Sequence, residues 1–224
     1  MTVNNLTIEQ RGDEERAERG HLDALLFTTP GCPHCASVKA ILSTLLQEGK
    51  IALLEIVDAS LETGRAQAWG VKSVPWLMLG SLQFEGALSL GELRLWAERA
   101  TRADGMKIYF YEMLKSGKRA KVEQAIRRQP EQAAILGDLL LDSEASMAVR
   151  IGIGAVLEEL RGSGLLGALV PKLVQIVQDR EPRNRADAAH YLSLIANPAA
   201  LDALRNCLED ADPEIREIAQ EALE

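Results

Sequence analysis

Short apolar runs and helical patterns alternate over the first hundred residues. The apolar runs cover 22–27, 51–57, 77–79 and 82–84. A short apolar run bounded by turn residues is typical of a buried strand. Between these runs, apolar residues recur at helical spacing over 36–48, 61–69 and 90–100. The pattern therefore predicts an α/β domain with the order β-α-β-α-β-β-α.

From residue 104 onward the pattern contains no strand. Apolar residues keep helical spacing, and breaks at Gly162, Gly164 and Pro198 separate the helices. We expect helices over 107–116, 118–128, 131–141, 146–160, 165–178, 183–196, 199–208 and 213–223.

An internal repeat runs through this helical part. Residues 179–189 align with 210–220, so that Arg185 coincides with Arg216, and 142–157 forms a looser third copy that carries Arg150. A repeat of about 31 to 35 residues suits a helix pair, which buries its apolar face against the next pair. The sequence thus predicts a polar segment at 1–20, an α/β domain at 21–103 and an all-α solenoid at 104–224.

Charge and composition exclude several classes of function. The chain has 224 residues, 47% of them hydrophobic, and a net charge of -8 without a strongly basic region. Nucleic acid and anionic membranes are therefore poor partners. No run approaches the roughly 18 apolar residues of a membrane span, and the polar first twenty residues lack the apolar core of a secretory signal. We expect a cytoplasmic protein.

Two of the three cysteines lie close together, in Gly31-Cys32-Pro33-His34-Cys35, between a predicted strand and a predicted helix. This position places Cys32 at a helix N-terminus, where free N–H groups and the helix dipole stabilise an anion such as a thiolate. Such cysteines reach pKa values of roughly 3.5–7.5 and attack disulfides at neutral pH. We expect Cys32 to be the nucleophile and Cys35 the resolving thiol, with no cofactor.

A metal site is the alternative for this pair. Structural zinc normally takes four ligands, but the chain has no second cysteine pair, and the nearest other ring nitrogen in sequence belongs to His21. An iron–sulfur cluster shared between two subunits stays open. Cys207 lies among leucines at a helical position, which predicts a buried, unreactive thiol.

The α/β part resembles thioredoxin-like proteins. Gly31 to Cys35 is similar to the glutaredoxin and bacterial disulfide-oxidase form of the redox motif, and the segment 69–77 is similar to that around their cis-proline. The resemblance implies that Val74–Pro75 is cis, and that Pro75 lies beside Cys32. It also implies that the Val74 backbone pairs with an extended substrate and that Trp76 borders the site.

The same resemblance implies roles for two more residues, but some positions differ from the family pattern. Pro33 and His34 are expected to tune the Cys32 thiolate. The Trp and buried Asp of thioredoxins are replaced by Gly31 and Leu26, and 85–89 keeps only part of the glutathione-binding pattern of glutaredoxins. Glutathione therefore stays an open alternative to a protein partner.

The helical part resembles HEAT repeats. The shared feature is Asp-x-x-Pro followed three residues later by Arg, at 179–185 and again at 210–216. In that setting the Asp caps a helix, Pro occupies its first turn, and Arg reaches the turn of a neighbouring repeat.

These features together predict a thiol–disulfide oxidoreductase. Its substrate would be a disulfide or dithiol of a protein partner, docked on the helical repeats. The alternative is an adaptor or redox-sensing binding protein with little turnover of its own.

Overall fold

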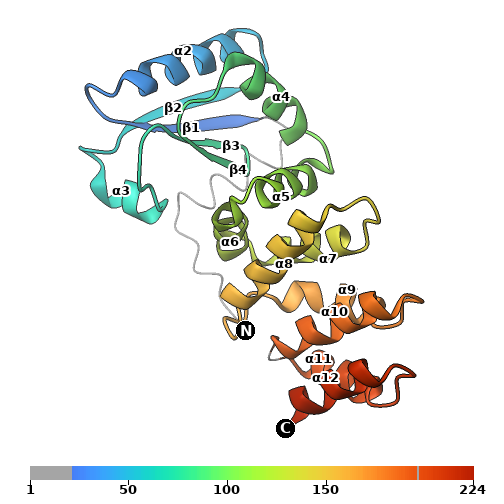
Figure 1. Cartoon of the computed structure of the whole chain (residues 1–224). Coiled ribbons are helices and arrows are strands. Elements are labelled where there is room, and N and C mark those ends of the chain that lie inside the picture. Colours follow the sequence, from blue (N-terminus) through green and yellow to red (C-terminus); the bar gives the residue numbers. More distant parts are fainter. Residues whose placement is uncertain (1–21, 196) are drawn as a thin grey trace. The chain divides into compact units, whose positions relative to one another are not determined.

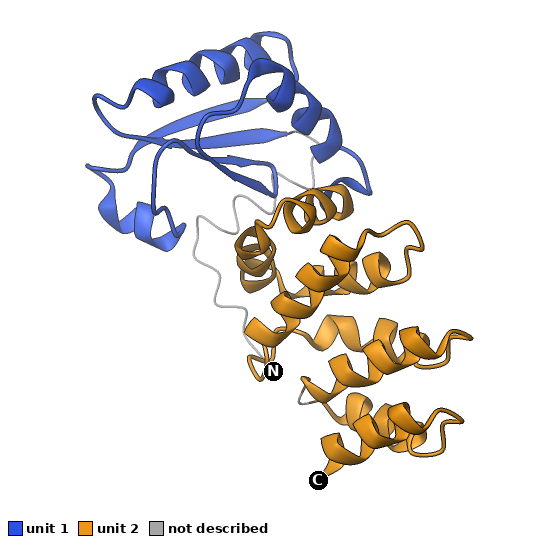
Figure 2. Ribbon diagram, in the orientation of Figure 1, with its two compact units in different colours: residues 1–106 blue, residues 107–224 orange. Residues whose placement is uncertain are grey.

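A computed structural model describes residues 22–195 and 197–224 and divides the chain into two compact units, 1–106 and 107–224 (Figures 1 and 2). The predicted polar segment 1–20 and His21 lie outside the described residues. The units divide after Met106, close to the expected boundary after residue 103. The stretch that follows α4 is a turn, because the N–H of Gly105 donates to the carbonyl of Arg102 at 3.0 Å and the next helix begins at Gly105.

Unit 1 follows the predicted order of strands and helices. Its sheet has four strands in the described residues, in the order β2-β1-β3-β4, with β1 and β2 parallel and the other neighbours antiparallel. The elements are β1 (Asp23–Thr28), α2 (Pro33–Gln47), β2 (Leu53–Asp58), α3 (Thr63–Ala68), β3 (Trp76–Leu79), β4 (Leu82–Glu85) and α4 (Leu90–Ala100).

Both faces of this sheet are covered. Helices α2 and α4 lie on one face and α3 lies on the other (Figure 1). On the α3 face, Ala66 packs with Phe27, Val57, Trp76 and Met78 in one buried cluster. The ends of the elements follow local signals: Ser89 and Glu92 form a capping box at the start of α4, and Gly80 turns the β3–β4 hairpin with φ +56°.

The strand register brings three chain segments to one end of the sheet. Thr28, the last residue of β1, lies beside Asp58, the last residue of β2. Phe27 lies opposite Trp76, the first residue of the antiparallel β3. The loop that leaves β1 and the loop that enters β3 therefore meet at the same edge, although about forty residues separate them in sequence.

Unit 2 consists of stacked helices in two layers. Helix α6 packs on α8, and α10 packs on α12, while α7, α9 and α11 form the second layer. The α8–α10 contact is close, since the Tyr191 hydroxyl lies 3.3 Å from the position of a Cβ at Gly154. The elements are α5 (Gly105–Lys115), α6 (Arg119–Arg128), η1 (Pro130–Ala133), α7 (Ala134–Leu140), α8 (Met147–Glu159), η2 (Gly167–Leu169), α9 (Val170–Ile176), α10 (Pro182–Ser193), α11 (Pro198–Cys207) and α12 (Pro213–Leu223).

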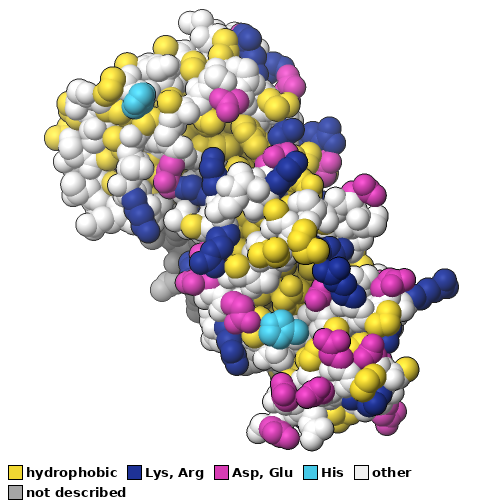
Figure 3. Space-filling view, viewed as in Figure 1, with side chains coloured by type: hydrophobic (Ala, Val, Ile, Leu, Met, Phe, Trp, Pro, Cys, Tyr) yellow, Lys and Arg dark blue, Asp and Glu magenta, His cyan; other side chains and the backbone are white. Residues whose placement is uncertain are grey.

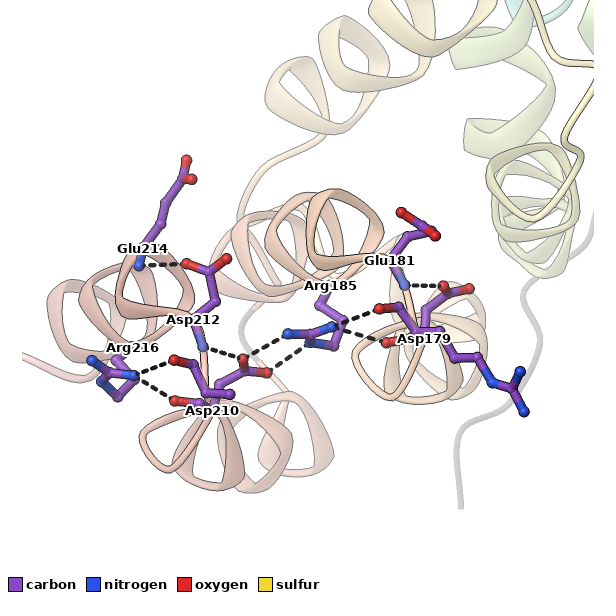
Figure 4. Close-up of polar contacts among 9 residues, drawn as sticks. Asp179, Glu181, Arg185, Asp210, Asp212, Glu214 and Arg216 are labelled. Carbon is purple, nitrogen blue, oxygen red and sulfur yellow. Dashed lines mark hydrogen bonds and ion pairs between the residues drawn. The ribbon is translucent and has the colours of Figure 1, made fainter.

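Arg185 connects two consecutive repeats, as expected (Figure 4). Its Nε and one terminal nitrogen each donate to the Asp210 carboxylate at 2.8 Å. The other terminal nitrogen donates to the carbonyls of Asp179 and Arg180 in its own turn. Arg216 likewise donates to two carbonyls of its own turn, those of Asp210 and Ala211.

The expected capping role of the first Asp is wrong. Asp212, directly before the helix, caps α12 by accepting from the N–H of Glu214 at 3.0 Å. Asp210 instead accepts from the N–H of Asp212 and from Arg185, and Asp179 accepts from the N–H of Glu181. Proline in the first helical position makes the residue before it the N-cap, so the first Asp shapes the turn and receives the neighbouring Arg.

Candidate active site

Cys32 is the N-cap residue of α2. Its backbone is extended, Pro33 takes the first helical position, and the N–H of Cys35 donates to the Cys32 sulfur at 3.2 Å. The N–H of Cys32 in turn donates to the carbonyl of Thr29 at 3.3 Å, which closes the loop after β1. The sulfur thus lies where the first turn of a 15-residue helix presents its free N–H groups.

The two cysteines differ in exposure. They form a disulfide, with Cα atoms 5.4 Å apart. Cys32 is partly exposed, whereas Cys35 is 4% exposed and packs into the face of α2 that covers the sheet. Of the two sulfurs, that of Cys32 is the one that an outside disulfide can reach.

The Val74–Pro75 peptide bond is cis, which confirms that expectation. The carbonyl of Pro75 accepts from the N–H of Gly86 at 2.9 Å. The N–H and carbonyl of Val74 make no hydrogen bond with any described residue. Because Val74 comes just before β3, its backbone groups are free to pair with another chain at the edge where the cysteine loop begins.

A pocket of about 330 Å³ lies beside this segment. Its apolar part comes from α3 and the loops around it, and its polar rim includes Thr29 from the cysteine loop. Lys72 is the one charged side chain among the described residues that line it. The lining residues are Thr29, Ala59, Thr63, Ala66, Gln67, Val71, Lys72, Ser73 and Val74. The pocket joins the two motifs that sequence analysis treated separately.

Lys72 and Thr29 were not identified from the sequence as binding residues. Both lie within segments that carry the motifs, but no pattern marked their side chains. Their place in the pocket depends on how the chain passes from α3 (Thr63–Ala68) into β3 (Trp76–Leu79), which only the fold supplies.

Trp76 is fully buried, which corrects the expectation that its side chain borders the site. Its ring lies edge-to-face with Phe27 at 5.5 Å and with Trp69 at 5.9 Å between ring centroids. Its indole nitrogen has no acceptor among the described residues. Trp76 therefore supports the site from beneath and presents no side-chain surface to a substrate.

The remaining candidate residues fall into two groups. Pro33 and His34 are exposed on the first turn of α2, beside Cys32 in sequence, so their tuning role stays a prediction. Cys207 is 5% exposed, as expected, and burial raises the pKa of its thiol.

Within residues 22–195 and 197–224, no three His, Cys, Asp or Glu side chains lie close enough together to hold a metal ion. No helix in that part of the chain is both long and apolar enough to cross a membrane.

Comparison with known proteins gives two matches. Residues 133–224 match the family model of HEAT repeats. A thioredoxin from Methanocaldococcus jannaschii is 31% identical over 64 residues, which is 28% of this chain and 75% of the relative. The matches agree with the two architectures of the structure, a cysteine-bearing α/β unit and a helical-repeat unit.

Proposed function

The chain belongs to the thioredoxin family, and from this premise we propose that it is a thiol–disulfide oxidoreductase acting on a protein partner. One observation carries the proposal: the Cys32 sulfur is partly exposed at the N-cap of α2, while its disulfide partner Cys35 is buried. This asymmetry suits a nucleophile that meets the substrate and a second thiol that only meets the first.

In the reducing direction, the Cys32 thiolate attacks one sulfur of a substrate disulfide. The substrate S–S bond breaks, a Cys32–substrate mixed disulfide forms, and the released substrate thiolate takes a proton from water. Cys35 then loses its proton and attacks the Cys32 sulfur, which releases the second substrate thiol and re-forms the Cys32–Cys35 disulfide. A dithiol donor must reduce that disulfide again, and the reverse sequence oxidises a substrate dithiol.

Val74 and Pro75 are proposed to hold the substrate. The unpaired N–H and carbonyl of Val74 can form a short two-sided backbone pairing with an extended segment next to the substrate disulfide. The adjoining pocket can take one side chain of that segment, and Lys72 favours an acidic one. His34 and the helix N-terminus are proposed to stabilise the Cys32 thiolate between turnovers.

The helical-repeat unit is proposed to select the partner. HEAT repeats often mediate protein binding, and stacked helices offer an extended surface. The backbone pairing proposed at Val74 carries little sequence information by itself, so selection needs a second surface.

A redox-sensing binding protein is the second candidate function. It is favoured by the extent of the HEAT match, 133–224, a region that disulfide exchange does not require. In that case the state of the Cys32–Cys35 pair would change binding, and turnover would be slow.

Turnover of a small aromatic disulfide by the full chain tests the proposal. We expect catalysis with a dithiol reductant, its loss in Cys32→Ser, and a trapped mixed disulfide in Cys35→Ser. Cys207→Ser is the matched control and should leave the rate unchanged. Absence of turnover in the unchanged protein would favour the sensor, and a comparison of glutathione with a dithiol as reductant decides whether glutathione is a partner.

A further inference from the structure

The first part of helix α8 is apolar on the side that faces solvent. Its buried face carries Val149, Ile153 and Val156, all with no exposed surface. On the opposite side, Met147 is 54% exposed and Ile151 is 66% exposed, one turn apart on the same face. Two large apolar side chains thus lie side by side on an exposed helix face, which makes this face a candidate contact surface.

Two arginines flank this exposed pair. The Arg183 guanidinium of α10 lies 3.9 Å from the Met147 sulfur, and no described carboxylate pairs with it. On the other side, Arg119 of α6 donates to the carbonyl of Ala155, one turn beyond Ile151. Figure 3 shows hydrophobic side chains gathered over α8, with both basic and acidic side chains around them.

The charge around this pair is mixed: residues 142–160, which include α8, contain four acidic residues and one arginine. Residues 107–128, which include α6 and most of α5, contain seven Lys or Arg and two Glu. Three of the acidic groups near α8 have cationic neighbours: Asp142 lies 3.3 Å from Lys107, Glu123 lies 3.5 Å from Arg119, and Glu159 lies 3.8 Å from Arg127. Arg183 is the guanidinium beside Met147 that has no carboxylate partner among the described residues, so it can receive a carboxylate from another molecule.

We propose that Met147, Ile151, Arg119 and Arg183 form a docking surface, the α8 surface, for a protein segment that presents an apolar side chain beside a carboxylate. The apolar side chain covers Met147 and Ile151, and the carboxylate pairs with the fork of Arg183. This inference rests on the proposed function, since it names the chemistry by which the helical unit selects a partner.

This chemistry favours a protein segment over other occupants. Nucleic acid and anionic lipid need a dense basic surface, whereas here two guanidinium groups flank an apolar centre. An acidic, amphipathic helix or strand satisfies both features at once.

Fluorescence anisotropy of the full chain with synthetic peptides tests the inference. The probe is a fluorescein-labelled helical peptide of Glu, Ala and Leu, with Leu along one face. Comparison peptides replace Glu by Lys or Leu by Ser. We expect the Glu–Leu peptide to bind and both comparison peptides to bind at least about tenfold more weakly, since each loses one of the two contacts.

Variants locate the binding. Ile151→Glu should weaken the Glu–Leu peptide about tenfold or more, because it removes an apolar contact and adds a like charge. Arg183→Glu should weaken the same peptide and strengthen the Lys–Leu peptide. Leu201→Glu is the matched control, because Leu201 is also exposed, at 38%, but lies on α11; it should bind as the unchanged protein does.

Three outcomes would overturn the inference. The first is that the Glu–Leu peptide does not bind, and the second is that Ile151→Glu and Leu201→Glu weaken its binding equally. The third is that a photo-reactive benzophenone side chain at position 151 crosslinks two copies of the chain, or crosslinks within one chain. Turnover of a small disulfide, measured on the same samples, tests the proposed function separately. Normal turnover with unaltered peptide binding would reject only the α8 surface.

Discussion

Replacing Trp76 by Phe tests whether the Trp76 side chain only supports the fold beneath the site or also contacts the substrate. Trp76 has no exposed surface, and its ring packs edge-to-face on Phe27 and Trp69. Its indole N–H finds no acceptor among the described residues. The substitution therefore removes packed atoms and an unpaired donor together, and these two changes have opposite effects on stability.

The magnitudes decide the net effect. A buried Trp→Ala change lowers the free energy of unfolding by about 3–5 kcal/mol. This is a large share of the total for a domain, which is roughly 5–15 kcal/mol. Trp76→Phe keeps an aromatic ring and should lose about 1–2 kcal/mol of packing. Removal of a buried, unpaired N–H raises the free energy of unfolding by about 1 kcal/mol or more. We expect a net loss below about 2 kcal/mol for Phe, and about 3–5 kcal/mol for Ala.

Tryptophan fluorescence during urea unfolding measures this loss, because the three tryptophans of the chain, at 69, 76 and 96, all belong to unit 1. Trp96→Phe is the matched control, since Trp96 is buried and packs on Phe84 in the same unit. Both variants should unfold at lower urea and keep the KM for a protein disulfide. An unchanged stability for Trp76→Phe with a KM raised several-fold would mean that the indole reaches the substrate, and the burial argument would be wrong.

Three further predictions concern charge and reactivity. In the reduced protein at pH 6 to 7, iodoacetamide should modify Cys32 before the two buried cysteines, and His34→Ala should slow that reaction; equal labelling of all three thiols would contradict an activated Cys32. Lys72→Glu should raise the KM for a disulfide peptide with acidic residues and leave the KM for its neutral analogue unchanged, as steady-state kinetics can show. The hydrogen bond from Arg185 holds the pKa of Asp210 below its usual value of about 4. Below about pH 4 the unfolded chain binds a proton at Asp210 that the folded chain does not, so the helical unit should lose stability as the pH falls through that range. Asp210→Asn should reduce this pH dependence of the melting temperature, measured by far-UV circular dichroism. An unchanged pH dependence in the variant would show that other groups cause it.

Residues that act through the local chain were predictable from the sequence. The bounds of α4 (Leu90–Ala100) and the hairpin turn at Gly80 follow signals within a few residues, whereas the cis bond at Pro75 was implied by the resemblance of 69–77 to thioredoxin-like proteins. The helices expected over 131–141 and 165–178 each contain a 3-10 turn before the α-helix, which helical spacing alone cannot distinguish.

Residues that act through tertiary packing were not predictable in the same way. All four residues of β3 (Trp76–Leu79) are buried, so the strand shows no alternation that could assign Trp76 to one face. Lys72 needed the approach of two loops to become part of a pocket. The sequence does contain one signal that was missed: Pro213 at the first helical position identifies Asp212, not Asp210, as the cap.

The polarity of the candidate site explains why a second unit would be useful to a chain with the proposed activity. The groups proposed to hold the substrate are the Val74 backbone and a pocket whose described lining includes one charge, Lys72. Such a site accepts many extended segments and discriminates weakly, because backbone pairing reads no side chain. A docking contact on the helical unit, in the same chain, would raise the local concentration of one partner near Cys32 to about the millimolar range for a short connection. In that arrangement the choice of partner depends on its affinity for the helical unit, and the rate of disulfide exchange depends on the reactivity of the Cys32 thiolate. Substitutions on the α8 surface should for that reason change which protein is turned over without changing how fast a small disulfide reacts.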